Sequence, residues 1–246
     1  MKKIIQKHLF NLIPKKLVDY IFYNHPEYIK QLNGQISFSQ EGEDMVLKRV
    51  FENINEGFYI DIGAHHPSLF SNTNYFCQKG WRGINIEPIP KSKIVFDLER
   101  PNDTNLELVV SEKDALVEFY MFEPSLMNTI SKKQAEENKK FNWCKFKETV
   151  LIQSVPLRKL LDEHLPVETR INFMSIDVEG AEMSVLKSND WEKYRPDVLL
   201  IECINKGIED ILKTETHSFL TINSYNLFAK TGNTMFYKRK GFFEFS

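Results

Sequence analysis

The segment 58–90 limits the fold more than any other part of the chain. It begins with an aromatic and β-branched run, 58–60, which is typical of a buried strand and ends at Asp61. Gly63 follows, and a glycine there suits a tight turn at which a strand stops and a ligand can approach the backbone. The segment therefore opens like the first strand and turn of a nucleotide-binding α/β fold.

The remainder of this segment predicts a βαβ unit. A polar run at 71–73 would cap a helix that ends near residue 80, and the free amides of such a helix start suit an anionic group. A second strand, 83–86, then delivers Glu87, which lies 26 residues after Asp61. At about this spacing, βαβ nucleotide folds place an acidic residue over the ribose hydroxyls. We therefore expect a nucleoside site.

Composition narrows the class of protein. With 246 residues and 42% hydrophobic content, the chain is long enough for one α/β domain and a small appendage. A net charge of −2 argues against a nucleic-acid partner. The three cysteines form no CxxC pair, so neither a disulfide framework nor a structural zinc site is expected. No apolar run approaches the roughly 20 residues of a membrane span, and we expect a cytoplasmic protein.

Residues 1–34 differ in character from the main domain, 35–246. Lysines alternate with apolar residues in 1–32 at spacings that predict two short helices broken before Pro14, each with a basic and an apolar face. One interpretation is peripheral contact with the inner face of an anionic membrane. The other is that these helices pad the outside of the main domain.

Ser39 would cap a helix that leads into the first strand, and this places Gln40 and Glu41 either at the edge of the ligand cleft or in a solvated first turn. Further strands are predicted at 106–110, followed by Ser111, and at 115–121 and 150–155. Residues 123–149 are rich in lysine and glutamate, which is typical of an exposed lid or insertion. The aromatic residues in this lid, Phe141, Trp143 and Phe146, would face an acceptor.

The segment 171–202 forms a second centre. A strand at 171–176 ends at Asp177, and Glu179 and Glu182 follow at the start of a helix. Three crowded carboxylates require a cation, a hydrogen-bonding substrate or raised pKa values. The alternative is that Glu182 points to solvent and Glu179 favours the helix dipole. A strand at 198–201 ends at Glu202, and a hairpin is expected at 225–229 and 234–237.

In order along the chain, the motifs SQEGEDMVL, FYIDIGAHHP, SNT, GWRGINIEP, VVSEKDALVEFY, SIDVEGAEMSVL and RPDVLLIE resemble the FkbM family of S-adenosylmethionine-dependent methyltransferases. The resemblance begins at about Phe38 and extends to the hairpin. It implies a Rossmann-like class I methyltransferase, an α/β fold with a seven-stranded, mostly parallel sheet and an antiparallel C-terminal hairpin. The chain departs from the wider methyltransferase pattern at His65, His66 and Pro67, where glycines are usual.

The resemblance also implies roles for individual residues. The first strand tip and the 71–73 segment would hold the methionine end of S-adenosylmethionine, Glu87 its ribose and Ser111 its adenine. For the proton released by the acceptor we expect His65, Asp177 or Glu179. A divalent cation such as Mg²⁺, if one takes part, would be held by Asp177 and Glu179. The full expected cofactor set is Asp61, Gly63, Ala64, Ser71, Asn72, Thr73, Glu87, Pro88, Ser111 and Asp177.

The expected reaction is methyl transfer to a hydroxyl of a small molecule, sugar or glycan. A nicotinamide oxidoreductase is one alternative, but it would show a fuller Gly-x-Gly-x-x-Gly, and Gly63 stands alone. A non-catalytic nucleotide-binding module is another, but it would be expected to lose the acidic residues. Aromatic residues in the final hairpin could serve a homodimer.

Overall fold

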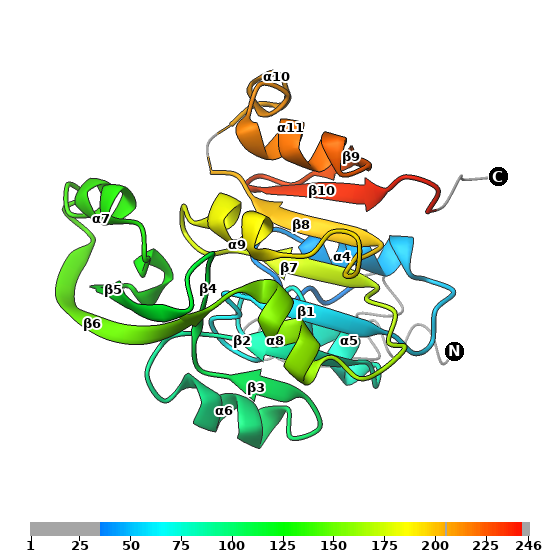
Figure 1. The fold of residues 1–246 in the computed structure, drawn as a ribbon, viewed down its shortest axis with the longest axis horizontal. Helices are drawn as coiled ribbons and strands as arrows, with labels where there is room; N and C mark the ends of the chain where they lie inside the picture. Colours follow the sequence, from blue (N-terminus) through cyan, green and yellow to red (C-terminus); the bar gives the residue numbers. More distant parts are fainter. Residues whose placement is uncertain (1–34, 205, 243–246) are drawn as a thin grey trace, which may run out of the picture. The chain divides into compact units, whose positions relative to one another are not determined.

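The computed structural model describes residues 35–204 and 206–242, and the chain from Phe38 onward forms one compact unit. Its main sheet has seven strands (Figure 1). The first five in spatial order are parallel, and β10 runs antiparallel to both of its neighbours. This confirms the predicted sheet and C-terminal hairpin. The spatial order is β3 (Thr104–Leu106), β2 (Arg82–Ile86), β1 (Phe58–Ile62), β7 (Phe173–Ile176), β8 (Val198–Glu202), β10 (Thr234–Arg239) and β9 (Tyr225–Lys230).

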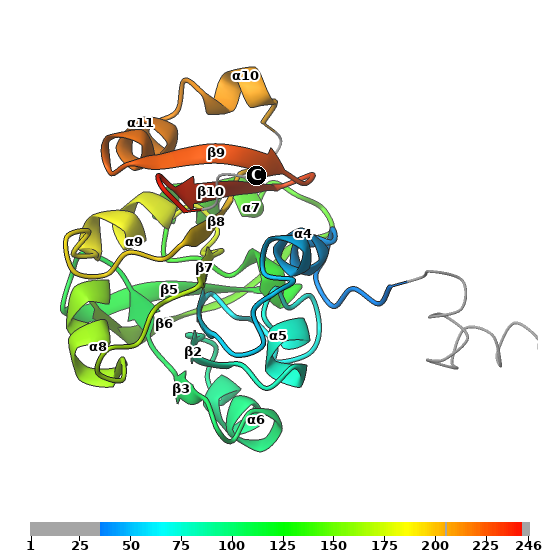
Figure 2. The same cartoon turned by 90° about the vertical axis from the view of Figure 1, so that its right-hand side faces the viewer.

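Alternation along the strands divides the core between the two faces of this sheet. One face packs an aromatic cluster, which includes Phe51, Trp81 and Phe173, beside α4 (Glu43–Val50) and α5 (Asn74–Gln78). The other face is mainly aliphatic and is covered by α8 (Leu157–His164), α9 (Glu182–Ser188) and α11 (Glu215–Ile222). Figure 2 shows α4 and α5 on one side of the sheet and α8 and α9 on the other. With both faces covered, the carboxyl edge of the parallel strands is the place for a ligand.

A second, three-stranded sheet lies beside the main one, in the order β4 (Val109–Val110), β6 (Lys145–Val155), β5 (Ala115–Glu123). The sequence did not predict it. The strand expected at 106–110 is in fact two strands, because the chain leaves the main sheet at exposed Glu107 and joins the second sheet as β4.

The segment predicted as a lid connects β5 and β6 and is more ordered than its composition suggested. It contains a 3₁₀ helix, η1 (Ser125–Met127), and α7 (Lys132–Asn138), and β6 begins at Lys145 rather than near residue 150. Figure 1 shows this part projecting to one side of the main sheet.

Two helix starts differ from expectation. The N-cap of α4 is Gly42, whose φ is 87°, and not Ser39 as expected. The Ser39 hydroxyl instead donates to the Asp44 carboxylate at 2.8 Å. Thr73 occupies the N-cap of α5, but its side chain makes no capping bond. Two further helices, α6 (Ser92–Glu99) and α10 (Ile208–Ile211), lie where no element was predicted, as does α11.

The helices predicted within 1–32 lie outside the described residues. Among the residues that are described, no helix has the length and apolar character needed to cross a bilayer.

Candidate functional site

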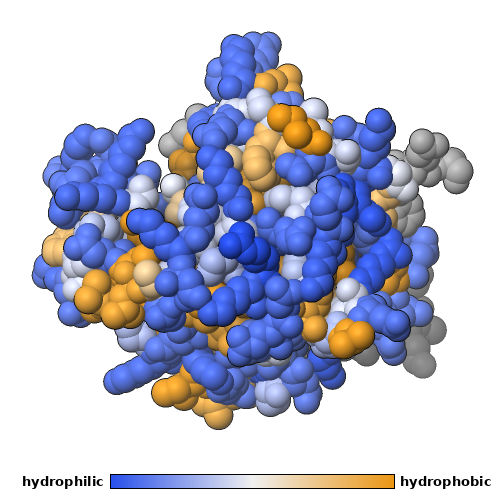
Figure 3. Space-filling view, viewed as in Figure 1, coloured by the Kyte–Doolittle hydropathy of each residue, from blue (hydrophilic) through white to orange (hydrophobic). Residues whose placement is uncertain are grey.

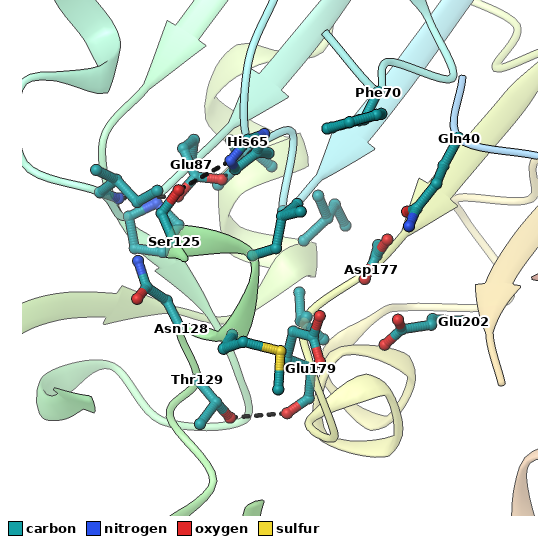
Figure 4. A pocket seen from close by; sticks show the side chains of 18 of the residues that line it. Gln40, His65, Phe70, Glu87, Ser125, Asn128, Thr129, Asp177, Glu179 and Glu202 are labelled. Atoms are coloured by element: carbon teal, nitrogen blue, oxygen red, sulfur yellow. Dashed lines mark hydrogen bonds between the residues drawn. The ribbon is translucent and has the colours of Figure 1, made fainter. Parts of the chain in front are cut away.

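A cavity of about 320 Å³ opens at the carboxyl ends of β1, β2, β7 and β8. The residues after these strands form its floor, and the lid residues 124–130 with Trp143 form its roof. Figure 4 shows Glu87 and His65 on one side of the cavity and Asp177, Glu179 and Glu202 on the other. The cavity therefore stands where open parallel sheets bind ligands.

Glu87 is fixed by two backbone amides. The amide of His65 donates to Oε2 at 2.7 Å, and the amide of Ile89 donates to Oε1 at 2.9 Å. The side chain is buried, and burial raises its pKa to about 7. Each carboxylate oxygen can accept a second hydrogen bond, so this residue is a rigid acceptor for two donors of a ligand. Pro88 and Ile89 continue the cavity wall, together with apolar 108–110.

His65 lies in the loop after β1 with a φ of 50°. Its Nε2 is 3.1 Å from the hydroxyl oxygen of Ser125 in the lid, and its buried Nδ1 has no partner. Burial, and then the neighbouring His66, lower the pKa of His65, which keeps the ring neutral near pH 7. His66 has a different task, because its Nδ1 accepts the amides of residues 68 and 69 within a turn.

Asp61 does not line the cavity. It lies behind the loop, where burial raises its pKa and the Thr73 hydroxyl donates to its carboxylate at 2.6 Å. Arg100 completes this buried network, since its guanidinium donates to Thr73 at 2.8 Å and to Ser71 at 3.0 Å. Asp61 therefore shapes the loop instead of contacting the space that a ligand would fill. No motif in the sequence pointed to Arg100.

Gly63 is required by a close approach between two loops. Its φ is 78°, and a Cβ added to it would lie 1.7 Å from the carbonyl oxygen of Asp177. The amides of Gly63 and Ala64 both donate to the carbonyl of Ile86, at 2.9 and 3.1 Å. The loop after β1 is thus held between the ends of β2 and β7.

The predicted cofactor residues therefore divide into two groups. Gly63, Asn72, Glu87, Pro88 and Asp177 line the cavity. Asp61, Ala64, Ser71, Thr73 and Ser111 do not. Ser111 is turned away, because its hydroxyl is 2.6 Å from that of Ser154 and both are buried. The two residues that precede Ser111, Val109 and Val110, line the cavity instead.

The acidic side of the cavity consists of Asp177, Glu179 and Glu202, each with a carboxylate oxygen within 4.8 Å of those of the other two. The register of β7 and β8 pairs residue 176 with 201, so the two strand tips stand side by side. Burial first, and then the neighbouring carboxylates, raise the pKa of all three groups.

Glu182, the third carboxylate expected here, is close enough to help raise the pKa values of Asp177, Glu179 and Glu202, but it does not line the cavity. Glu182 accepts the amide of Gly180 at 2.9 Å, and Glu202, from the next strand, takes its place in the cavity wall. Glu179, with a φ of 51°, has one buried carboxylate oxygen, Oε2, that lacks a partner. The cluster suits a cationic group, a divalent metal ion or a proton donor.

Gln40 and Glu41 edge the cavity, as one of the two interpretations of the first turn expected. Glu41 accepts both the backbone amide and the side-chain amide of Asn233, at 2.6 and 3.0 Å. Glu43 accepts the Thr231 hydroxyl at 2.6 Å. These bonds attach the start of α4 to the β9–β10 turn. No local sequence motif could predict them, because the bonded residues lie 188 or 192 positions apart.

The lid contacts both sides of the cavity. The Thr129 hydroxyl donates to the carbonyl of Glu179 at 2.7 Å, and Ser125 meets His65 on the other side. Asn128 also lines the cavity; its Oδ1 accepts the amide of Phe122, and its buried Nδ2 has no partner. Of the three lid aromatics expected to face an acceptor, only Trp143 lines the cavity.

A search among curated proteins finds no match. Similar solved structures include a precorrin-6y C5,15-methyltransferase from Geobacter metallireducens GS-15, with a TM-score of 0.42 and 10% identity over 80% of this chain and 88% of that one. Another is a TehB-like SAM-dependent methyltransferase from Corynebacterium glutamicum, with a TM-score of 0.40 and 9% identity over 92% of this chain and 100% of that one.

The family comparison is more specific than these structural likenesses. Residues 61–224 match the methyltransferase FkbM domain. This range contains Glu87, the lid and the acidic cluster. Because the match spans more than half of the sequence, it establishes membership. The chain belongs to the FkbM methyltransferase family.

Proposed function

We propose that the protein is an S-adenosylmethionine-dependent O-methyltransferase that acts on a hydroxyl of a sugar or glycan. The observation that carries this proposal is the division of one cavity into a side with Glu87 and apolar residues and a side with three carboxylates. The first side suits an adenosine, and the second suits a cation and a hydroxyl that must lose a proton.

The residues present fit the methyl donor. Glu87 offers one oxygen to each of two ribose hydroxyls, and Val109 and Val110 offer apolar surface for adenine. Gly63 contributes bare backbone to the cavity wall beside Glu87. A sulfonium beside Asp177, whose pKa burial raises to about 7, would favour the ionised form of this carboxyl and would itself be stabilised by that charge. When bound, S-adenosylmethionine supplies an electrophilic methyl group, and the protein has to align an oxygen with it.

The protein also has to take up the proton of the acceptor. His65 is neutral near pH 7 because burial lowers its pKa, and in the tautomer whose Nε2 donates to the Ser125 hydroxyl its unpartnered Nδ1 can accept a proton. On the acidic side, raised pKa values suit Asp177 and Glu179 to the same task. Their position on the side of the cavity opposite Glu87 favours them as the groups nearest the reacting oxygen.

A sugar acceptor is supported by polar atoms that have no partner inside the protein. Asn128 Nδ2 can only donate and Glu179 Oε2 in its ionised form can only accept, and both are buried in residues that line the cavity. Buried polar atoms are seldom left unsatisfied. A hydroxyl both donates and accepts, so a ligand with several hydroxyls can satisfy both atoms.

The test is ligand binding followed by thermal unfolding. Adenosylmethionine and adenosylhomocysteine should raise the unfolding midpoint, whereas NAD should not. Glu87→Ala should weaken adenosylhomocysteine binding by about tenfold to a hundredfold, the loss of one or two hydrogen bonds to a charged acceptor. Glu99→Gln, at an exposed site in α6, is the matched control and should bind normally. Stabilisation by NAD alone would end the proposal.

Within this proposal, either the methyl donor or a metal ion could neutralise the acidic cluster. The positive charge of the donor or a divalent ion such as Mg²⁺ held by Asp177, Glu179 and Glu202 would neutralise it. Transfer that is unaffected by EDTA assigns the role to the donor. Transfer that EDTA abolishes and Mg²⁺ restores assigns it to the metal.

A further inference from the structure

The lid carries three exposed aromatic side chains to which the proposed reaction assigns no role. Phe141, Trp143 and Phe146 are 44%, 61% and 38% exposed, and they fall within six consecutive residues. The rings of Phe141 and Trp143 stack with centroids 5.3 Å apart and an interplanar angle of 23°. We call Phe141, Trp143 and Phe146, with the lysines described below, the lid patch.

These aromatic residues are not needed to fill the interior of the lid. A separate small cluster does so, in which Tyr120, Phe122, Ala135 and Cys144 are buried and Met127 packs against them. Cys144 points inward while its neighbour Trp143 is exposed. A group of exposed aromatic side chains is a common mark of a binding surface.

Positive charge surrounds these rings. Residues 132–147 contain six lysines and two glutamates, in a chain whose net charge is −2. All six lysines are exposed, and the ammonium of Lys139 lies 4.8 Å from the centroid of the Phe146 ring. The six are Lys132, Lys133, Lys139, Lys140, Lys145 and Lys147. On the face shown in Figure 3, α7 presents a hydrophilic surface, and apolar surface gathers beside it over β5 and β6.

We propose that the lid patch docks on an anionic lipid bilayer. Tryptophan and phenylalanine rings partition into the interface between headgroups and acyl chains, and lysines are attracted to anionic headgroups. Lys139, Lys140 and Lys147 pair with Glu136, Glu137 and Glu123 at the surface. A neutral saccharide would stack on the rings but would not neutralise the other three lysines of the patch. A second copy docked through the same patch would bring lysines against lysines.

The lid patch lies next to the cavity, so docking on a bilayer would affect how an acceptor reaches the site. Trp143 both lines the cavity and belongs to the patch, so docking would bring the mouth of the cavity to the bilayer surface. An acceptor attached to a lipid would then enter without leaving the membrane. The inference rests on the lid alone and is independent of the methyl-transfer proposal and of residues 1–32.

The test uses the full chain and vesicles of phosphatidylcholine with and without phosphatidylglycerol. Wild type should sediment with the anionic vesicles and be released by salt. Lys140→Gln with Lys145→Gln should lower the partition coefficient about fivefold for each lysine. Phe141→Ser should also lower it, whereas Ile222→Ser, at a residue that is 83% exposed on α11, should not.

Fluorescence assigns the contact to the lid. Lipids brominated near the headgroup should quench Trp143, and Trp143→Phe should lose that quenching, because Trp81 and Trp191 are only 2% and 8% exposed. Normal adenosylhomocysteine binding by Phe141→Ser would show that a loss of docking is separate from a loss of the nucleoside site.

Several results would overturn the inference. Equal sedimentation of the lysine variant and wild type, or vesicle binding without quenching of Trp143, would place the contact elsewhere. Equal binding to neutral vesicles would remove the role of charge. A Trp143 signal that responds to soluble oligosaccharides but not to vesicles would assign the patch to glycan, and a dimer lost in Phe141→Ser without vesicle binding would assign it to a second copy.

Discussion

Glu87 should make the ligand-free protein lose stability as the pH rises. Burial raises the pKa of this carboxyl from 4.5 to about 7, so the folded state holds its proton over a range in which the unfolded state has released it. The stabilisation from the protonated form is complete below about pH 4.5. It is lost as the pH rises to about 7, and above that value the contribution is constant.

The shift sets the size of the effect. A difference between 4.5 and about 7 corresponds to roughly 3 kcal/mol of unfolding free energy. The side chain is only 5% exposed, so solvent screening takes little from this figure. For a chain of 246 residues, roughly 3 kcal/mol corresponds to a fall in the melting midpoint of about 6–12 °C.

Glu87→Gln isolates this contribution from the other buried acids, whose raised pKa values act in the same direction. Glutamine does not titrate, but it has one oxygen where glutamate has two, so one of the backbone amides of His65 and Ile89 loses its acceptor. That loss costs about 1–3 kcal/mol at every pH. The variant should therefore be less stable than wild type at pH 5, and the difference should shift by about 2–3 kcal/mol in favour of the variant by pH 8, which closes or reverses the gap.

Urea unfolding between pH 5 and pH 8 measures the gap, with Glu99→Gln as a control that should follow wild type throughout. A gap that stays constant over this range would refute the reasoning, because it would mean that Glu87 is ionised in the ligand-free fold from pH 5 upward. A gap that widens would reverse the sign of the linkage and exclude burial as the dominant influence on this carboxyl.

Three further outcomes are expected. Asp177→Asn should leave adenosylhomocysteine binding measurable while it lowers turnover by at least about a hundredfold, and unchanged turnover would remove this residue from the reaction. Gly63→Ala should lower the unfolding free energy, measured by urea unfolding, by about 2–4 kcal/mol, because the new Cβ would lie 1.7 Å from a carbonyl oxygen. Gly80 has a similar φ but open space around it, so Gly80→Ala should cost only about 1 kcal/mol. Equal losses in the two variants would contradict this explanation. Arg100→Met should cost about 3–5 kcal/mol, because it leaves Asp61 buried without its cationic neighbour, and a loss below about 1 kcal/mol would show that the network is dispensable.

Local patterns predicted the parts of the fold that local physics decides. The buried runs of β1, β2, β7 and β8 and the acidic residues at their ends, Glu87 and Asp177, are readable because strand periodicity and strand termination are properties of neighbouring residues. The resemblance to the FkbM family supplied the seven-stranded, mostly parallel sheet with its antiparallel hairpin, which no single strand encodes; the order of the strands was not predicted.

Helix α6 shows why other elements escaped prediction. Ile94, Val95 and Leu98 are 58%, 39% and 78% exposed, whereas Phe96 is buried, so the apolar residues do not mark the buried face of this helix. A periodicity argument assumes that they do. Here the buried contacts come from Phe96 and from Arg100, which follows the helix and donates to Thr73 and Ser71.

The site shows a similar limit. Asp61 was expected in the cavity because it ends a strand, but the hydroxyl of Thr73 and the nearby Arg100 hold it behind the loop. Glu202 resembled the end of an ordinary strand and became part of the site only because β8 lies beside β7. Such contacts depend on side-chain directions across the sheet, which sequence spacing does not specify.

The bond from the Thr129 hydroxyl to the Glu179 carbonyl joins the roof of the cavity to the acidic edge of its floor. With Ser125 and His65 meeting on the opposite side, the roof is anchored at two points that flank the opening. Both anchors belong to residues 125–129, so a displacement of this one short segment would release the roof from the loop after β1 and from the loop after β7 together.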